Sequence, residues 1–77
     1  MNRDRLEGNW KQLKGAVRSR WGKLTDDDID IINGERERLV GKLQERYGLA
    51  KEAAETEFRS FVESLDREDR ERRRKAS

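Results

Sequence analysis

A stripe of apolar residues near the start of the chain limits what the chain can fold into. Successive residues of the stripe are separated by 4, 3, 4, 4 and 3 positions. At about 100° per residue, this spacing places them within a sector about 80° wide on one side of a helix. The pattern predicts an amphipathic helix from Asp4 to Gly22 that must pack against the rest of the chain. The stripe consists of Leu6, Trp10, Leu13, Val17, Trp21 and Leu24.

The next segment carries the signals that start and end a short second helix. Thr25 is followed by three aspartates, so its hydroxyl is suited to cap a helix whose acidic first turn opposes the helix dipole. Asp28 occupies the third helical position, which a capping box fills with Glu or Gln. Asn33-Gly34 predicts the helix end, because glycine adopts the left-handed conformation at little cost. We therefore expect a helix from Asp26 to Ile32.

Two further helices account for the remaining apolar residues. One is predicted from Glu35 to Tyr47, ended by Gly48, and the next from residue 49 or 50 to Leu65. The last helix is expected to turn alanines 50, 53 and 54 inward, together with Val62 and Leu65. The fold class is therefore all-α, a compact bundle of about four helices. The predicted core consists of Leu6, Trp10, Leu13, Val17, Trp21, Leu24, Ile29, Ile32, Leu39, Val40, Leu43, Tyr47, Ala54, Phe58 and Phe61.

Three glycines, at positions 8, 15 and 22, lie on the first helix opposite the apolar stripe. Each costs the helix up to about 1 kcal/mol relative to alanine. Two explanations remain open: a neighbouring backbone approaches closely there, or the helix is only marginally stable.

Charged residues make up 47% of the chain, and their distribution is uneven although the net charge is only +2. Residues 1–24 carry an excess of basic side chains, whereas residues 25–37 are mostly acidic. Attraction between these neighbouring segments is the simplest interpretation. Residues 66–77 contain no large apolar side chain, so we expect a helical domain at 1–65 followed by a charged, Arg-rich tail that is a solvated helical extension or disordered.

Two blocks of sequence, NWKQLKGAVRSRWGKLTDDD and GERERLVGKLQERYG, resemble the CsbD-like family of small bacterial proteins. The resemblance covers about residues 1–62 and includes both tryptophans. It implies a cytoplasmic protein of the general stress response, with a fold similar to SAM-like arrangements of two crossed helical hairpins. The family has no established catalytic residues, so the resemblance assigns none here. The Arg-rich tail departs from the family pattern.

Catalysis and metal binding both lack a credible site in the sequence. The chain has no histidine and no cysteine, which removes the commonest general base and the best nucleophile. Asp26, Asp28 and Asp30 alternate as in a calcium-binding loop, with Glu37 at the final ligand position. That loop requires glycine where this chain has Ile31, so helix capping explains the aspartates better. We expect no enzyme activity, cofactor, metal or small-molecule substrate.

Nucleic acid is the best-supported alternative ligand. The turn at Gly48 resembles a helix-hairpin-helix motif, in which two glycines present amides to a phosphate, although the second glycine is Ala50 here. A tight turn with one left-handed glycine is the structural explanation, and the sequence favours it. Phosphate contacts by basic side chains need no base recognition. The candidate contacts are Lys11, Lys14, Arg18, Gly48, Lys51, Arg70, Arg72, Arg73, Arg74 and Lys75.

The sequence thus predicts a small non-enzymatic stress-response domain that binds an unidentified macromolecule or acts as a protectant. Weak, sequence-independent nucleic-acid binding is the first alternative, and self-association as a protein-interaction module is the second. Membrane binding through the tryptophan face of the first helix ranks below both, because packing would occupy that face. We expect a monomer.

Overall fold

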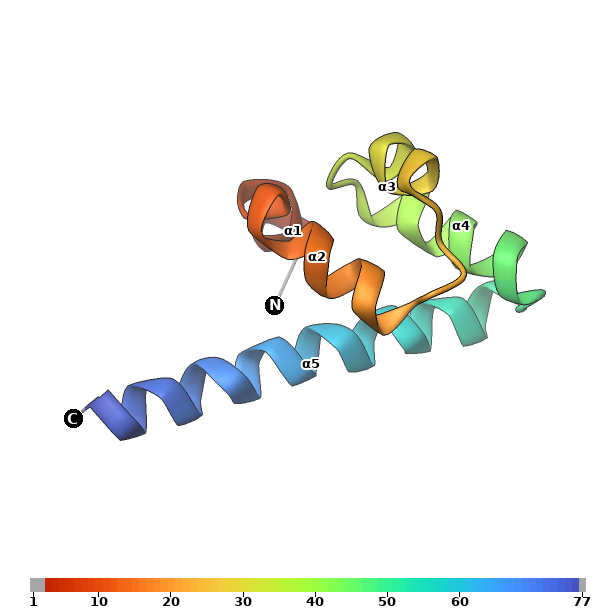
Figure 1. Cartoon of the computed structure of the whole chain (residues 1–77). Helices are drawn as coiled ribbons and strands as arrows, with labels where there is room; N and C mark the ends of the chain where they lie inside the picture. The colour runs from red at the N-terminus through yellow and green to blue at the C-terminus, as the bar shows by residue number, and fades with distance from the viewer. Residues whose placement is uncertain (1–2, 77) are drawn as a thin grey trace.

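The computed structural model describes residues 3–76, and the side chains of residues 6–67. Every regular element in this part of the chain is a helix, which confirms the all-α prediction. The finer prediction of a SAM-like pair of crossed hairpins stays a prediction. Figure 1 shows α1, α2 and α3 arranged above a long C-terminal helix, with α4 packed along it. The helices are α1 (Arg3–Gly8), α2 (Trp10–Arg20), α3 (Asp26–Ile32), α4 (Arg36–Tyr47) and α5 (Lys51–Ala76).

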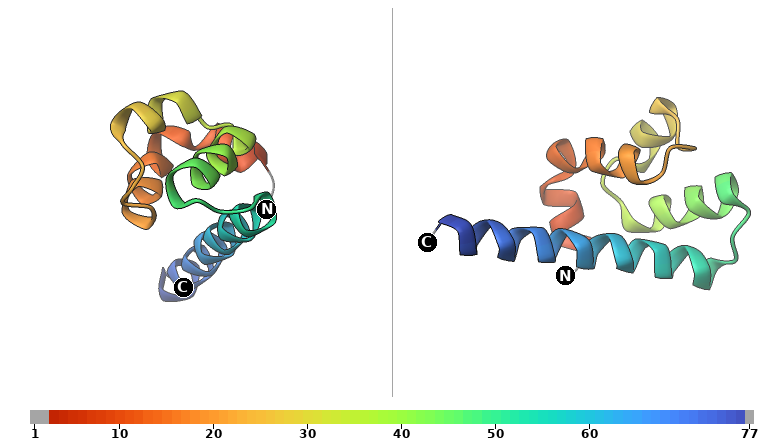
Figure 2. Two further views of the ribbon diagram at one scale, coloured as in Figure 1. Left: turned by 90° about the vertical axis from the view of Figure 1, so that its right-hand side faces the viewer. Right: turned by 60° about the horizontal axis from the view of Figure 1, so that its bottom comes forward.

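The first predicted helix is broken in two at Asn9, which corrects the expectation of one continuous helix from residue 4 to residue 22. Asn9 has φ −120° and ψ 19°, and its carbonyl accepts hydrogen bonds from the amides of Gln12 at 3.0 Å and Leu13 at 2.9 Å. Asn9 therefore starts a new helix, and α1 turns away from the axis of α2 (Figure 2). Glycine at position 8 is a poor helix former and asparagine a good N-cap residue, so the break suits the local sequence.

The second predicted helix has the expected bounds, Asp26–Ile32, and the expected capping box. The amide of Asp28 donates to Thr25 Oγ1 at 3.1 Å, and the amide of Thr25 donates to Asp28 Oδ2 at 3.0 Å. Two successive left-handed residues end the helix, Asn33 with φ 44° and Gly34 with φ 82°. This turn reverses the chain into α4.

Helices α4 and α5 form an antiparallel pair, joined at Gly48, which has φ 63°. α4 has nearly the predicted bounds, since Glu35 is its N-cap residue rather than its first residue. α5 continues past the expected end at Leu65 as far as Ala76 and extends beyond the other helices (Figure 1). The domain boundary at residue 65 stays a prediction.

The core lies between α5 and the four shorter helices. Of the predicted core residues, Trp10, Leu13 and Tyr47 are only partly buried and pack against the core from its margin. Ala50 and Ala53 are exposed, contrary to expectation, and Ala53 lines an open groove beside Trp21 rather than packing into the core. The buried apolar residues are Leu6, Val17, Trp21, Leu24, Ile29, Ile32, Leu39, Val40, Leu43, Ala54, Phe58, Phe61 and Val62.

Gly15 on α2 and Gly41 on α4 are both exposed, and neither is required by a close contact. A Cβ added at either position meets no heavy atom of the described residues within 4 Å beyond its own helix. Close approach of a neighbouring backbone therefore does not explain Gly15. The remaining explanation is that the glycine makes the helix less stable. We expect Gly15→Ala and Gly41→Ala each to raise the free energy of unfolding by about 0.5–1 kcal/mol, because alanine loses less backbone entropy on folding.

Urea denaturation followed by tryptophan fluorescence measures this gain. The two effects should add in the double variant, since the sites lie on different helices and share no neighbour. Gly48→Ala is the matched control, because its positive φ should make the same substitution destabilising. A loss of stability in Gly15→Ala would contradict the open space at that position.

Candidate functional site

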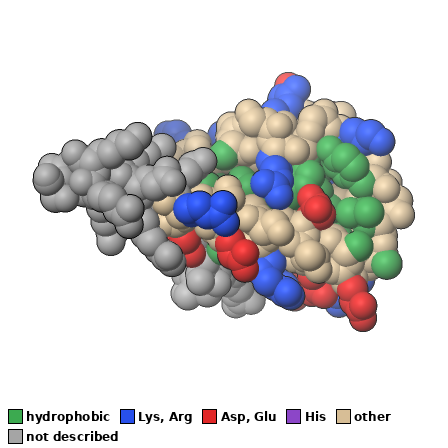
Figure 3. Space-filling model, turned by 90° about the horizontal axis from the view of Figure 1, so that it is seen from below, with side chains coloured by type: hydrophobic (Ala, Val, Ile, Leu, Met, Phe, Trp, Pro, Cys, Tyr) green, Lys and Arg blue, Asp and Glu red, His purple; other side chains and the backbone are tan. Residues whose placement is uncertain are grey.

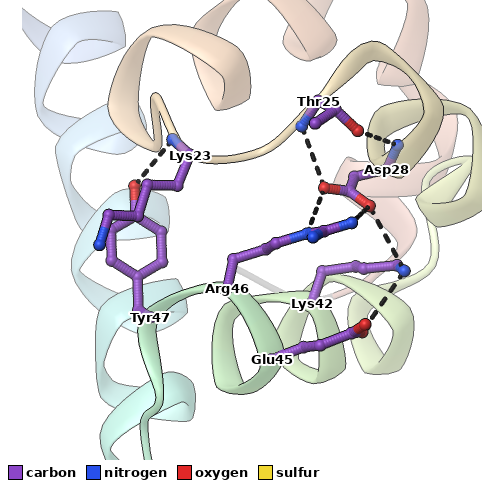
Figure 4. A network of polar contacts seen from close by, with 7 residues as sticks. All are labelled: Lys23, Thr25, Asp28, Lys42, Glu45, Arg46 and Tyr47. Atoms are coloured by element: carbon purple, nitrogen blue, oxygen red, sulfur yellow. Dashed lines mark hydrogen bonds and ion pairs between the residues drawn. The ribbon is translucent and has the colours of Figure 1, made fainter.

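The most organised polar group in the described chain is a clasp around Asp28, which we define as Thr25, Asp28, Lys42 and Arg46 (Figure 4). Asp28 is only 1% exposed and is the one charged side chain buried among the described residues. Arg46 donates two hydrogen bonds to the Asp28 carboxylate, from Nε to Oδ2 at 2.8 Å and from Nη2 to Oδ1 at 2.9 Å. Lys42 Nζ lies 3.4 Å from Oδ1. The clasp thus ties the start of α3 to the face of α4.

These contacts strongly favour the ionised form of Asp28. The paired guanidinium of Arg46 and the amide of Thr25 hold the pKa of the Asp28 carboxyl well below its ordinary value of 3.8, and outweigh the opposing effect of burial. The same carboxylate raises the pKa of Arg46. A carboxylate held ionised by so many donors is a poor proton donor or acceptor near neutral pH. The clasp is therefore suited to fastening helices together rather than to acid–base chemistry.

A second polar contact joins the turn that follows α2 to the last residue of α4 (Figure 4). The amide of Lys23 donates to the hydroxyl of Tyr47 at 3.2 Å, and Lys23 Nζ lies 5.1 Å from the centre of the Tyr47 ring. Beside this contact lies a groove of about 290 Å³, whose walls include Trp21, Leu49 and Glu57. Trp21 Nε1 donates to Glu57 at 3.4 Å, so the polar groups of the groove contact one another. The arrangement indicates packing rather than a ligand site.

The predicted nucleic-acid contacts fall into separate places. Lys11, Lys14 and Arg18 are exposed on α2, and Arg18 forms an ion pair with Asp26. Gly48 and Lys51 lie at the α4–α5 turn, where Gly48 provides the left-handed residue that a tight turn needs. The side chains of Arg70, Arg72, Arg73, Arg74 and Lys75 lie outside the described residues, on the last turns of α5.

The turn and the tail are at opposite ends of α5 (Figure 1). At 1.5 Å per residue, the 26 residues of α5 span about 39 Å. The structure therefore does not gather the candidate residues into one patch. A nucleic acid that touched both groups would have to run along the length of the helix.

The aspartates that resemble a calcium loop are used in other ways. Asp28 belongs to the clasp and Asp26 pairs with Arg18. No group of three or more carboxylates that could hold a metal ion occurs in the described part of the chain. Trp21 is buried and Trp10 half-buried, so packing uses the face on which membrane binding was considered. Between residues 3 and 76, no helix is both long and apolar enough to cross a membrane.

The sequence predicts the capping role of Asp28 but not its contacts with Lys42 and Arg46. They lie four residues apart on α4 and therefore share one face of that helix. That spacing shows that they can act together, but it does not identify their partner, since Asp28 is 18 residues from Arg46 in sequence.

Comparison with known proteins identifies the chain's relatives. The CsbD-like family model matches residues 4–56. The UPF0337 protein ECA0631 of Pectobacterium atrosepticum is 59% identical over 61 residues, covering 79% of this chain and 88% of that protein. The UPF0337 protein YjbJ of Escherichia coli O6:H1 is 58% identical over 66 residues, covering 86% and 96%. The UPF0337 protein PA4738 of Pseudomonas aeruginosa is 57% identical over 65 residues, covering 84% and 100%. The chain therefore belongs to the CsbD-like family of small stress-response proteins.

Proposed function

We propose that this protein serves the stress response without catalysis, by contacting a macromolecular partner through its charged surface. The observation that carries the proposal is that almost all described charged side chains lie at the surface. Asp28, the buried one among the described side chains, is committed to the clasp, whereas the others reach the surface. In addition, no buried side-chain nitrogen or oxygen in the described part lacks a hydrogen-bond partner. Among the described side chains, no buried polar atom is thus left unpaired for a catalytic role. This supports a role in which the charged surface binds a partner.

The nature of the surface narrows the class of partner. Charges of both signs are interspersed on the face shown in Figure 3, which does not present a continuous basic patch. Ile31, at 49% exposure, is the exposed large hydrophobic residue among the described side chains. We therefore favour a contact made mainly by charged side chains, with some apolar area in the groove beside Leu49 and Ala53. The cytoplasm, which the family resemblance implies, is the compartment that we propose.

Nucleic acid is a second candidate partner, supported by the exposed lysines of α2. Lys11 and Lys14 are three residues apart and therefore neighbours on one helix face. Such a pair could contact adjacent phosphates without reading sequence. The tail, residues 66–77, adds six basic residues, together with four acidic ones. Self-association remains a third candidate, without a specific contact in its favour.

Fluorescence anisotropy of labelled random-sequence DNA and RNA tests the nucleic-acid candidate. We expect weak binding by the full chain that falls steeply with salt, since displaced counterions drive such binding. Lys11→Gln with Lys14→Gln should weaken binding to every sequence and reduce the salt dependence. Arg59→Gln, which removes an exposed charge outside the candidate set, is the control.

Absence of binding at low salt would eliminate the nucleic-acid candidate and leave protein partners or bulk protection. Because the lysine variant removes two charges and Arg59→Gln removes one, an equal loss of binding free energy per charge removed would show a general charge effect rather than a site on α2.

A further inference from the structure

We propose that α1 is a latch, which opens about Gly8 and Asn9 while the rest of the domain stays folded. Its length is the first reason. α1 has six residues, whereas an isolated helix is only marginally stable in water even at about 12–15 residues. α1 therefore depends on docking for its helical structure, and undocking and unfolding of this segment are one event.

In the part of α1 whose side chains the structure describes, residues 6–8, Leu6 makes the contact with the core. Leu6 is 1% exposed and reaches the core, whereas Glu7 and Gly8 are exposed. Among the side chains of α1 that the structure describes, one thus provides the buried apolar contact. Opening removes that contact and leaves the remaining core residues on α2 to α5 in place.

The other half of the docking site is the backbone of the α3–α4 turn. Gly34 is buried there with φ 82°. A Cβ at this position would lie 3.2 Å from Trp10 Cβ and 3.3 Å from Glu7 Cα. Glu7 and Trp10 lie on either side of the break at Asn9. The hinge, which we define as Gly8 and Asn9, therefore lies beside Gly34. The close approach requires the absence of a side chain at this one residue.

Hydrogen bonds to Asn9 hold the start of α2. The carbonyl of Asn9 accepts the first hydrogen bonds of α2, and the helical ladder of α1 stops before it. Opening at Gly8 and Asn9 therefore breaks no hydrogen bond within α2.

Opening changes the chemical nature of the surface, which goes beyond the charged surface of the proposed function. With α1 docked, Ile31 at 49% is the most exposed large apolar side chain among the described residues, and apolar residues at the core margin, such as Trp10 and Tyr47, are partly buried. With α1 open, the part of the core that Leu6 covered is uncovered. The latch thus changes how much of the apolar core is exposed to solvent.

Native-state hydrogen exchange of the full chain tests the latch. We expect the amides of Glu7 and Gly8 to exchange at least about tenfold faster than that of Leu43, with little dependence on low concentrations of urea, because local openings expose little surface. Leu43, which is fully buried on α4, should exchange only with global unfolding. Equal rates and equal urea dependence at the three residues would overturn the proposal.

Two glycine variants separate the latch from general loss of stability. Gly34→Ala and Gly48→Ala both place alanine at a positive φ, but a Cβ at Gly48 meets no described atom within 4 Å. Relative to Leu43, exchange at Glu7 and Gly8 should speed up about tenfold in Gly34→Ala, since overpacking forces the contact apart. In Gly48→Ala that ratio should not change. The same ratio in both variants would show that Gly34 does not hold the latch.

Discussion

Replacing Trp21 with alanine is expected to leave most of the protein unfolded at room temperature. Trp21 is 3% exposed, and its ring lies 5.1 Å from that of Phe61 on α5, tilted by 54°. Truncating a buried tryptophan typically costs about 3–5 kcal/mol. A domain of this size has a net stability of roughly 3–5 kcal/mol. The expected loss is therefore comparable with the whole free energy of unfolding of the domain.

Far-UV circular dichroism with urea titration measures this effect without relying on the deleted fluorophore. Trp10→Ala is the matched control, because Trp10 is only half-buried and should cost clearly less. Trp21→Phe retains an aromatic ring against Phe61 and should recover part of the stability. A Trp21→Ala variant that unfolds at the same urea concentration as the parent would contradict the core described above.

The sequence was most informative where the signals that fix an element are its immediate neighbours. The bounds of α3 were correct because Thr25 caps its start and Asn33-Gly34 ends it, all within a few residues. The break at Asn9 was missed because the apolar stripe continues in phase through it. The partner that accommodates the break, Gly34, lies 25 residues away in sequence and is recognisable only from the close approach in the folded chain.

The clasp illustrates the same limit for polar contacts. Local reasoning identified Asp28 as a capping residue, and that role is confirmed by its bonds with Thr25. Its pairing with Arg46 depends on how the α3–α4 turn folds α3 back onto α4, and the sequence contains many other arginines. The predicted nucleic-acid contacts show the same limit, because basic residue type and a local turn motif do not place residues in space, and the length of α5 separates two of their groups.

Breaking the clasp is expected to have the second-largest effect on stability. Arg46→Met keeps the aliphatic part of the side chain but removes both hydrogen bonds to the buried carboxylate. Loss of one partner from a buried pair typically costs about 3–5 kcal/mol. We expect about 2–3 kcal/mol here, because Arg46 is 40% exposed, and Lys42 and Thr25 continue to contact Asp28. Arg38→Met, which breaks the exposed pair with Glu35, is the control and should cost less than about 1 kcal/mol.

The pH dependence of this cost identifies its origin. The pKa of Asp28 is lower in the folded protein than its ordinary value of 3.8, so the unfolded chain takes up the proton first as the solution is acidified. The stability that Asp28 contributes is therefore present above about pH 4 and is lost as the pH falls further. Urea denaturation at pH 7 and at pH 2.5 should show a smaller difference between the parent and Arg46→Met at the lower pH. A difference that stays constant between the two pH values would contradict the assignment of the cost to the ion pair between Arg46 and Asp28.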